Sequence, residues 1–228
     1  MILLEGATKI YESGKANAVT AVHGINLEIA QEEFVIIVGR SGSGKTTLLN
    51  LMAGLTRPTL GKVRLDGQDL WELNDQQQSA LRNQKIGFVF QFPSLLPTLT
   101  VYENVILPTT FSSKRSSPQS SERASSLLKQ VGLTDKVAAY PRQLSAGQQQ
   151  RVVIARSLIN QPQILLADEP TSNLDERTEK EIMGLFLNLH HSLGLTIVLV
   201  THTRQLISDG IRCVEMAEGQ IIEQTLLQ

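Results

Sequence analysis

Runs of apolar, mostly β-branched residues alternate along this chain with longer segments whose apolar residues recur every three or four positions. The runs Phe34–Val38, Ile86–Gln91, Ile164–Ala167 and Leu195–Val200 contain few polar residues and show no long alternation. Continuous apolar runs are typical of strands buried on both faces of a sheet. Because helical segments separate these runs, the pattern predicts an α/β fold with a largely parallel sheet covered by helices on both faces.

Segments with helical spacing fill much of the chain between these strands. In Glu122–Val131, for example, the apolar residues lie three or four positions apart and form one face of a helix. The Ser-rich stretch Ser112–Ser121 is predicted to be a solvated connection between helices. The segments predicted to be helical are Thr47–Ala53, Trp71–Arg82, Val101–Leu107, Glu122–Val131, 148–160 and Thr178–Leu193.

The two ends of the chain are predicted to form further strands. Strand signals at Ile2–Leu4 and Thr20–Ile29 enclose a polar stretch in which Tyr11 is the only aromatic residue. Tyr11 is either an ordinary aromatic at a strand end or a ring on which adenine stacks, and its neighbours leave both readings open. Gly61–Gly67 alternates like an exposed strand that ends at Asp-Gly. The segment after Ile211 reads as a closing hairpin.

Composition narrows the class of protein. The chain has 228 residues, 41% of them hydrophobic, and a net charge of −1, so it can bury a core and lacks the charge of a nucleic-acid-binding protein. No apolar run approaches the roughly 18–20 residues that span a bilayer, and no secretory signal is evident. One cysteine excludes an internal disulfide and a cysteine metal cluster. These features favour a cytoplasmic protein.

A glycine-rich stretch follows the first buried strand. Gly39–Thr47 reads GRSGSGKTT and matches the phosphate-binding pattern G-x-x-x-x-G-K-[ST] between a strand and a helix. Glycines let backbone N–H groups converge on phosphate oxygens, while the lysine reaches the phosphates and the following threonine ligates Mg²⁺. The sequence therefore predicts a nucleotide site. Its predicted residues in this loop are Gly39, Ser41, Gly42, Ser43, Gly44, Lys45, Thr46 and Thr47.

Polar side chains end two of the buried strands. Asp168 and Glu169 follow one strand, and His202 follows another. Since ligands of parallel sheets bind beyond the carboxyl ends of the strands, Asp168 is expected to serve the Mg²⁺ of the phosphate loop. Glu169 points the opposite way along a regular strand, yet it lies where it can take a proton from water. His202 is expected to contact the γ-phosphate or the attacking water.

A second helix start resembles a phosphate cradle. Leu144–Gln148 reads LSAGQ, in which Ser145 is a suitable N-cap and small residues leave the helix N-terminus open to an anion. A single nucleotide is already served by the loop around Lys45. The second cradle therefore suggests a nucleotide held between two chains.

Together these motifs resemble the ATP-binding subunit of an ABC transporter over nearly the whole chain. The phosphate loop, Gln91, Leu144–Gln148, Asp168–Glu169, Ser172–Asp175 and His202 occur in that family's order and approximate spacing. The resemblance implies one domain, 1–228, with a P-loop NTPase (RecA-like) core, an N-terminal antiparallel β subdomain and an inserted α-helical subdomain. The core would comprise about 1–91 and 161–228. The helical subdomain would comprise about 92–160 and contain the family's signature motif, which is Leu144–Gln148 here.

The resemblance also implies roles for individual residues. Tyr11 would stack on adenine, Glu169 would be the general base, and His202 would position water and γ-phosphate. Gln91 would link Mg²⁺ and the attacking water to a transmembrane partner, and Lys45 would assist catalysis. The implied cofactors are ATP and Mg²⁺, and the implied metal ligands are Thr46, Gln91 and Asp168.

Other implied roles concern a second copy of the chain. Ser145, Gly147 and Gln148 would bind the γ-phosphate of ATP held by the opposite subunit, and Asp175 belongs to a loop that crosses the dimer interface. The implied assembly is a head-to-tail dimer around two ATP–Mg²⁺. Ala146 stands where the family usually has glycine, and it would be strained if its backbone needed a positive φ.

The stretch Phe92–Val105, with Tyr140–Pro141 before the signature, is similar to subunits of lipoprotein-releasing and macrolide-efflux exporters. The partner would then be a permease with four membrane spans, and the chain would lie on the cytoplasmic face of the membrane. The apolar cluster Phe88–Leu96 would line the groove for the partner's coupling helix, or form the core of the helical subdomain. The alternative is a regulatory ATPase of the cell-division type, which shares every motif. Neither cargo nor transport direction follows from the motifs.

Overall fold

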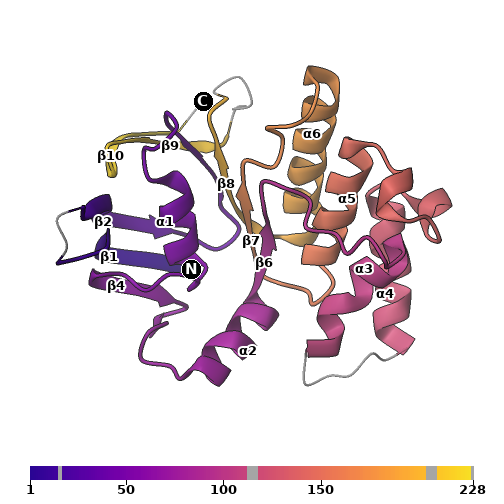
Figure 1. Cartoon of the computed structure of the whole chain (residues 1–228), viewed down its shortest axis with the longest axis horizontal. Coiled ribbons are helices and arrows are strands. Elements are labelled where there is room, and N and C mark those ends of the chain that lie inside the picture. Colours follow the sequence, from indigo (N-terminus) through magenta and orange to yellow (C-terminus); the bar gives the residue numbers. More distant parts are fainter. Residues whose placement is uncertain (15–16, 112–117, 204–209, 227–228) are drawn as a thin grey trace. The chain divides into compact units, whose positions relative to one another are not determined.

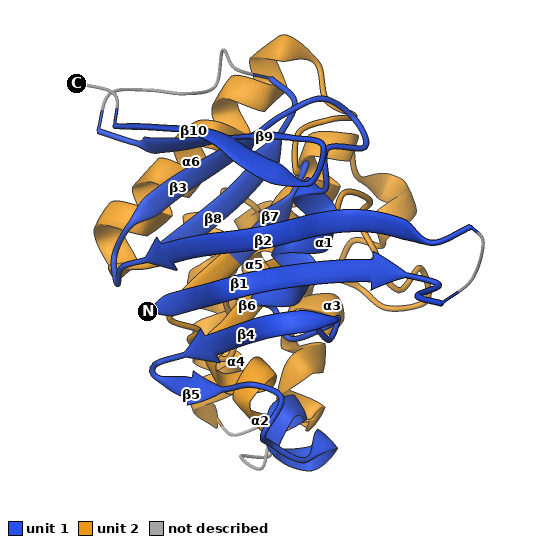
Figure 2. Ribbon diagram, turned by 90° about the vertical axis from the view of Figure 1, so that its left-hand side faces the viewer, with its two compact units in different colours: residues 1–79, 166–169, 196–228 blue, residues 80–165, 170–195 orange. Residues whose placement is uncertain are grey.

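The computed structural model describes residues 1–14, 17–111, 118–203 and 210–226 and divides into two compact units. Unit 1 comprises residues 1–79, 166–169 and 196–228, and unit 2 comprises residues 80–165 and 170–195 (Figure 2). The first six residues of the connection expected at 112–121 lie outside the described residues. Its last four belong to a helix, so that part of the prediction is wrong.

Unit 1 contains an antiparallel sheet with the strand order β2-β1-β4-β5, as expected for the N-terminal part of the chain (Figure 2). The first strand was predicted too short, at three residues, because its pairing with β2 shifts register between Leu4 and Ile10 and the apolar alternation is lost there. The strands are β1 (Ile2–Tyr11), β2 (Val19–Ile29), β4 (Leu60–Leu65) and β5 (Gln68–Asp69).

A second sheet has the strand order β10-β9-β3-β8-β7-β6, and β7 belongs partly to each unit. Its strand β3 pairs in parallel with β8 and β9, whereas β9 and β10 form the predicted antiparallel hairpin. Helix α1 (Lys45–Met52) contacts β8 of this sheet and also β1 and β2 (Figure 1). The strands are β3 (Phe34–Val38), β6 (Ile86–Val89), β7 (Ile164–Asp168), β8 (Thr196–Thr201), β9 (Arg212–Ala217) and β10 (Gln220–Leu226).

The helices of unit 2 pack around a common apolar core. Helix α5 (Ala146–Ser157) contacts α3 (Val101–Ile106), α4 (Pro118–Gln130) and α6 (Glu176–Leu193). Short 3₁₀ helices cover Leu107–Phe111, Thr134–Lys136 and Pro141–Gln143. The buried residues at the centre of this core are Val101, Val105, Leu127, Leu128, Val152 and Val153. The expected boundaries of the helical subdomain, about 92 and 160, stay a prediction.

Helix α2 (Asp75–Lys85) crosses from one unit to the other. It was expected from Trp71, but Asn74 caps it: the Asn74 side chain accepts from the Gln77 N–H at 2.9 Å, and the Gln77 side chain accepts from the Asn74 N–H at 3.1 Å. This reciprocal cap fixes the start of the helix after Asn74. Among the described residues, no helix combines the length and the apolar character needed to cross a membrane.

Candidate functional site

The phosphate loop lies in unit 1 between β3 and α1. Gly42 and Gly44 have φ values of 79° and 98°, which side chains rarely adopt. A Cβ atom on Gly39 would lie 2.6 Å from the Ser43 hydroxyl oxygen, so the backbone turns tightly there. Within the part of the chain that the structure describes, Gly44 leaves the first turn of α1 without a side-chain cap, and the buried Ser43 hydroxyl has no hydrogen-bond partner. These unsatisfied donors make the loop a suitable cradle for phosphate oxygens.

Lys45 and Thr46 bring charge and a metal ligand to this cradle. The buried Lys45 ammonium donates to the carbonyls of Gly39 at 2.7 Å and Arg40 at 3.0 Å, and burial lowers its pKa. The exposed Thr46 hydroxyl donates to the Asp168 carboxylate at 3.1 Å. Burial is the main cause that raises the pKa of Asp168, which lies at the end of β7. A hydroxyl and a carboxylate in contact are oxygen ligands of the kind that Mg²⁺ prefers.

Glu169 and His202 meet beside the same strand ends. Nδ1 of His202 lies 3.3 Å from a carboxylate oxygen of Glu169, and the side chain of His202 is 56% exposed. Glu169 has a φ of 43°, so it leaves the strand pleat immediately after Asp168. Its N–H still donates to the Val200 carbonyl at 2.9 Å. A carboxylate half-buried against an imidazole at the mouth of the site can accept a proton from water.

Tyr11 ends β1 in unit 1 and is 41% exposed. The Lys9 ammonium lies 5.2 Å from the centre of the Tyr11 ring and donates to the Arg57 carbonyl at 2.9 Å. The ring therefore has a cation over it while much of its surface stays accessible. This position suits a stacking platform as well as a strand-end aromatic.

The predicted signature lies in unit 2. Ser145 is the N-cap of α5, accepting from the Gln148 N–H at 3.3 Å, while the Gln148 side chain accepts from the Ser145 N–H at 3.0 Å. Ala146 is the first residue of α5 and does not have a positive φ, so alanine causes no backbone strain there. Gly147 is buried in the first turn. Asp175, in the same unit, caps α6 through the Thr178 N–H at 3.0 Å.

Gln91 is an exposed residue of unit 2, two positions after β6. The loop that follows is held by the buried Asn104, whose side chain bonds backbone groups of Leu96, Leu99 and Thr100 at 2.8–3.1 Å. The structure thus gathers Lys45, Thr46, Asp168, Glu169 and His202 in unit 1. Gln91, Ser145, Gly147, Gln148 and Asp175 lie in unit 2.

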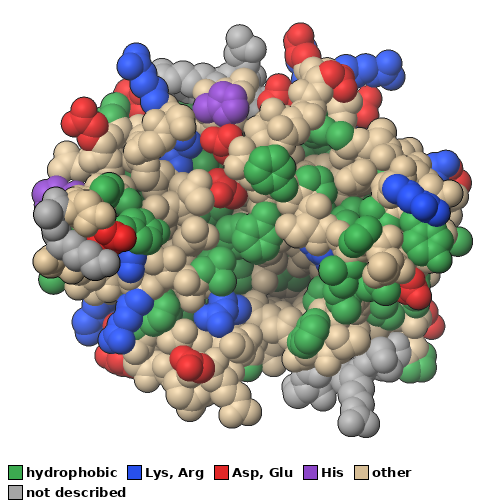
Figure 3. Space-filling model, in the orientation of Figure 1, with side chains coloured by type: hydrophobic (Ala, Val, Ile, Leu, Met, Phe, Trp, Pro, Cys, Tyr) green, Lys and Arg blue, Asp and Glu red, His purple; other side chains and the backbone are tan. Residues whose placement is uncertain are grey.

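The apolar cluster before and within this loop is at the surface. Phe90 and Phe92 are exposed, and the rings of Phe88 and Phe90 lie 4.3 Å apart. A cavity of about 310 Å³ lies beside them, walled by Leu107 and Phe111 among others. Figure 3 shows hydrophobic side chains gathered on the right-hand half of the face, over the helices α3, α4 and α5 of Figure 1. The exposed members of this cluster are therefore not part of the core of unit 2.

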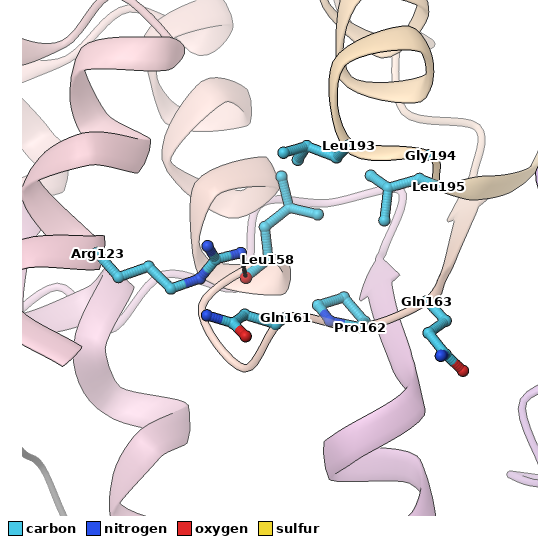
Figure 4. Close-up of a pocket in the computed structure, with 8 residues that line it drawn as sticks. All are labelled: Arg123, Leu158, Gln161, Pro162, Gln163, Leu193, Gly194 and Leu195. Atoms are coloured by element: carbon cyan, nitrogen blue, oxygen red, sulfur yellow. Dashed lines mark hydrogen bonds between the residues drawn. The ribbon is translucent and has the colours of Figure 1, made fainter. Parts of the chain in front are cut away.

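A second cavity, of about 370 Å³, lies where α5 and α6 end (Figure 4). Leu158, Leu193 and Leu195 form its apolar wall. Arg123 reaches in from α4 and donates to the carbonyls of Leu158 at 3.0 Å and Ile159 at 3.1 Å. These bonds satisfy carbonyls at the end of α5, so Arg123 has a structural role there.

Comparison with protein families decides the class of this protein. The family model described as ABC transporter matches residues 22–172, which contain the phosphate loop, the signature and the Asp168–Glu169 pair. This chain belongs to the ABC transporter family. It is an ABC-type ATPase cassette, and the prediction from the motifs is confirmed. The P-loop NTPase fold is confirmed as well, since solved ABC cassettes align with the whole chain.

Relatives of this ABC cassette have names from lipoprotein-releasing and macrolide-export systems. The lipoprotein-releasing system ATP-binding protein LolD of Bacteroides thetaiotaomicron is 45% identical over 221 residues, which is 97% of this chain and 99% of that protein. The macrolide export ATP-binding/permease protein MacB of Syntrophobacter fumaroxidans is 46% identical over 222 residues. Those residues make up 97% of this chain but 31% of that MacB protein. The relatives agree with the predicted exporter-like subfamily.

Two solved ABC cassettes cover 100% of this chain and are 99% covered themselves. A dimeric bacterial ABC transporter cassette aligns with a TM-score of 0.90 at 41% identity. A dimeric cassette in a post-hydrolysis state with ADP and Pi aligns with a TM-score of 0.89 at 40% identity.

Sequence reasoning missed two residues that position the site. Lys9 precedes Tyr11 by two residues in the same strand, and the period of two in a strand predicts that both side chains lie on one face. The apolar spacing predicts only that a helix begins at Thr178, although Asp-x-x-Thr is a capping pattern that places Thr178 against Asp175.

Proposed function

We propose that this chain is the ATP-hydrolysing subunit of a membrane ABC transporter of the lipoprotein-release or macrolide-export type. It dimerises head to tail around two ATP–Mg²⁺ and drives a permease with four membrane spans. The chain lies on the cytoplasmic face of the membrane, bound to that partner. The relatives named LolD and MacB and the two dimeric cassettes support this proposal.

The observation that carries the proposal is the grouping of Lys45, Thr46, Asp168, Glu169 and His202 in unit 1. The contact between Thr46 and Asp168 suits Mg²⁺, which neutralises phosphate charge when bound. Lys45 provides positive charge for the phosphates. Glu169 accepts the proton of the attacking water, and His202, 3.3 Å away, orients the Glu169 carboxylate.

A second copy of the chain completes each site in this proposal. The N-terminus of α5, with Ser145, Gly147 and Gln148, supplies backbone N–H groups and a partial positive charge to the γ-phosphate of the opposite subunit. Gln91 and Asp175 connect this half-site to the permease and to the dimer interface. Tyr11 stacks on adenine, with Lys9 against its ring.

The permease docks on the apolar surface of unit 2. Phe90, Leu107 and Phe111 line part of the cavity of about 310 Å³, and Phe111 is 78% exposed. Arg156, which also lines the cavity, donates to the Ser94 carbonyl at 2.6 Å and so fixes the preceding loop against α5. A short apolar helix of the partner fits such a surface, since it buries aromatic side chains that otherwise contact water.

Replacing Glu169 by Gln tests the proposal. The variant retains the shape of the side chain but cannot act as a base, so ATP turnover should fall by roughly 10²–10⁴-fold. ATP binding should persist, and ATP should trap a dimer that is detected by size-exclusion chromatography with light scattering. Glu28→Gln, at an exposed residue of β2, is the matched control and should behave like the unmodified chain. Normal turnover in Glu169→Gln would refute the role of this base.

A further inference from the structure

Gly147 faces another helix of its own chain. It is buried in the first turn of α5, and a Cβ atom there would come closer than 3.0 Å to the γ-methyl carbon of Thr178. Gly147 does not have a positive φ, so its backbone conformation would accept an alanine. Among the residues that the structure describes, the methyl group of Thr178 is therefore what requires a glycine at this position.

Thr178 cannot easily move this methyl group away. Its hydroxyl donates to one oxygen of the Asp175 carboxylate at 2.7 Å, and its N–H donates to the other at 3.0 Å. Rotation about χ1 would break the hydroxyl bond, and a β-branched side chain in a helix has few other rotamers. These bonds also hold the pKa of Asp175 below its usual range, with the Thr178 side chain as the first cause. Thr178 thus joins Asp175 to Gly147.

A second contact fixes the same two helices one turn further on. Arg151 of α5 donates to the Glu181 carboxylate of α6 at 3.0 Å. Arg151 follows Gly147 by four residues and Glu181 follows Thr178 by three, so each pair lies on one helix face. The starts of α5 and α6 are therefore held together at two successive levels.

We propose that Thr178 is a positioning residue that makes the signature Ser145–Gln148 and the loop of Asp175 move as one rigid piece. The proposed function places both segments at the nucleotide between two subunits, and this inference rests on it. In this arrangement, the methyl group of Thr178 sets the position of the α5 N-terminus relative to Asp175. Gly147 is a glycine because this methyl group occupies the space of its Cβ.

Exchanging one methyl group between the two positions tests this inference. Gly147→Ala should reduce ATP-dependent dimerisation of the Glu169→Gln chain by roughly ten- to hundredfold, as expected for an overpacked contact. The double variant Gly147→Ala with Thr178→Ser removes the clashing carbon and conserves the total volume. It should recover dimerisation to within about threefold of Thr178→Ser alone. The double variant Gly147→Ala with Thr178→Val keeps the clashing carbon, so its dimerisation should stay as low as that of Gly147→Ala.

Two further measurements separate positioning from folding and from the proposed function. ATP binding by the monomer, followed by fluorescence of a labelled nucleotide, should be the same in all variants, and circular dichroism should show the same helix content. If the double variant with Ser stays as impaired as Gly147→Ala, the glycine is required by something other than Thr178 and the inference is refuted. If the Glu169→Gln chain itself forms no dimer with ATP, the proposed function fails instead.

Discussion

Two glycines of the phosphate loop should respond differently to the same substitution. Gly42 and Gly44 both have a positive φ, so alanine at either position is strained by about 1–2 kcal/mol. At Gly42 a Cβ atom would have no atom of the described residues within 4 Å, apart from its own chain neighbours. At Gly44 it would overlap with the backbone carbonyl of Ala21 in β2. Alanine should therefore cost the same backbone strain at both positions, and a steric overlap should destabilise the folded chain only at Gly44.

The difference between the two variants isolates that steric term. Changes in the unfolded chain are similar for the two Gly→Ala substitutions and cancel. The Ala21 carbonyl belongs to a strand whose neighbouring residue, Val22, is buried and paired with Lys9, so it cannot simply move away. Overpacking of this kind costs about 1–3 kcal/mol. Gly44→Ala should thus be less stable than Gly42→Ala by about 1–3 kcal/mol, or about 2–12 °C in Tm.

Thermal unfolding without nucleotide measures this difference, because phosphate binding then does not contribute to Tm. Circular dichroism at one scan rate, with both variants and the unmodified chain, is sufficient. Both variants should unfold below the unmodified chain. Equal Tm values for Gly42→Ala and Gly44→Ala would refute the reasoning, since the overlap with Ala21 would then carry no energy.

Two other predictions concern unit 2. Hydrogen bonds from Thr178 to the ionised Asp175 carboxylate lower the pKa of Asp175 in the folded chain below its ordinary value of 3.8. The stability that the ionised carboxylate adds is therefore fully present above pH 3.8, and it is lost as the pH falls through the lower pKa of the folded chain. The Tm advantage over Asp175→Asn should therefore be largest above about pH 4 and disappear in stronger acid. Phe111→Ser should weaken co-purification with the membrane permease by roughly 10–100-fold while the ATPase rate of the isolated chain stays unchanged. Ile222→Ser, at an exposed residue of β10, is the control, and equal losses in both variants would contradict a docking role for Phe111.

The pattern of apolar residues predicted strand positions well where a strand is buried on both faces. The strand at Phe34–Val38 was predicted with its observed bounds, because all of its residues are buried and a glycine follows. The strand predicted at Ile86–Gln91 ends at Val89, and its burial alternates, since Phe88 is only half-buried. Aromatic residues that face a surface cavity thus resemble core residues in sequence.

Helix starts were less well predicted because their signals are local and easily outweighed by composition. The start of α4 was missed because Pro118–Ser121 is rich in serine, although proline suits the first turn of a helix. The capping residues Asn74 and Asp175 were both visible in the sequence. Contacts such as that between Gly147 and Thr178 were not, since they depend on how two helices pack.

The direction of the Glu169 side chain could not be predicted from the pattern of apolar and polar residues. A regular strand would direct the side chains of Asp168 and Glu169 to opposite faces. In the structure, the charges of both carboxylates favour the charged form of Lys45 and so oppose the lowering of its pKa by burial. We attribute the effect of Glu169 to its positive φ, which turns its side chain back toward the loop. This conformation costs about 1–2 kcal/mol. It is held by the hydrogen bond that the Glu169 N–H donates to the Val200 carbonyl at 2.9 Å. The strain therefore places a second carboxylate at a site that a straight strand would give only one.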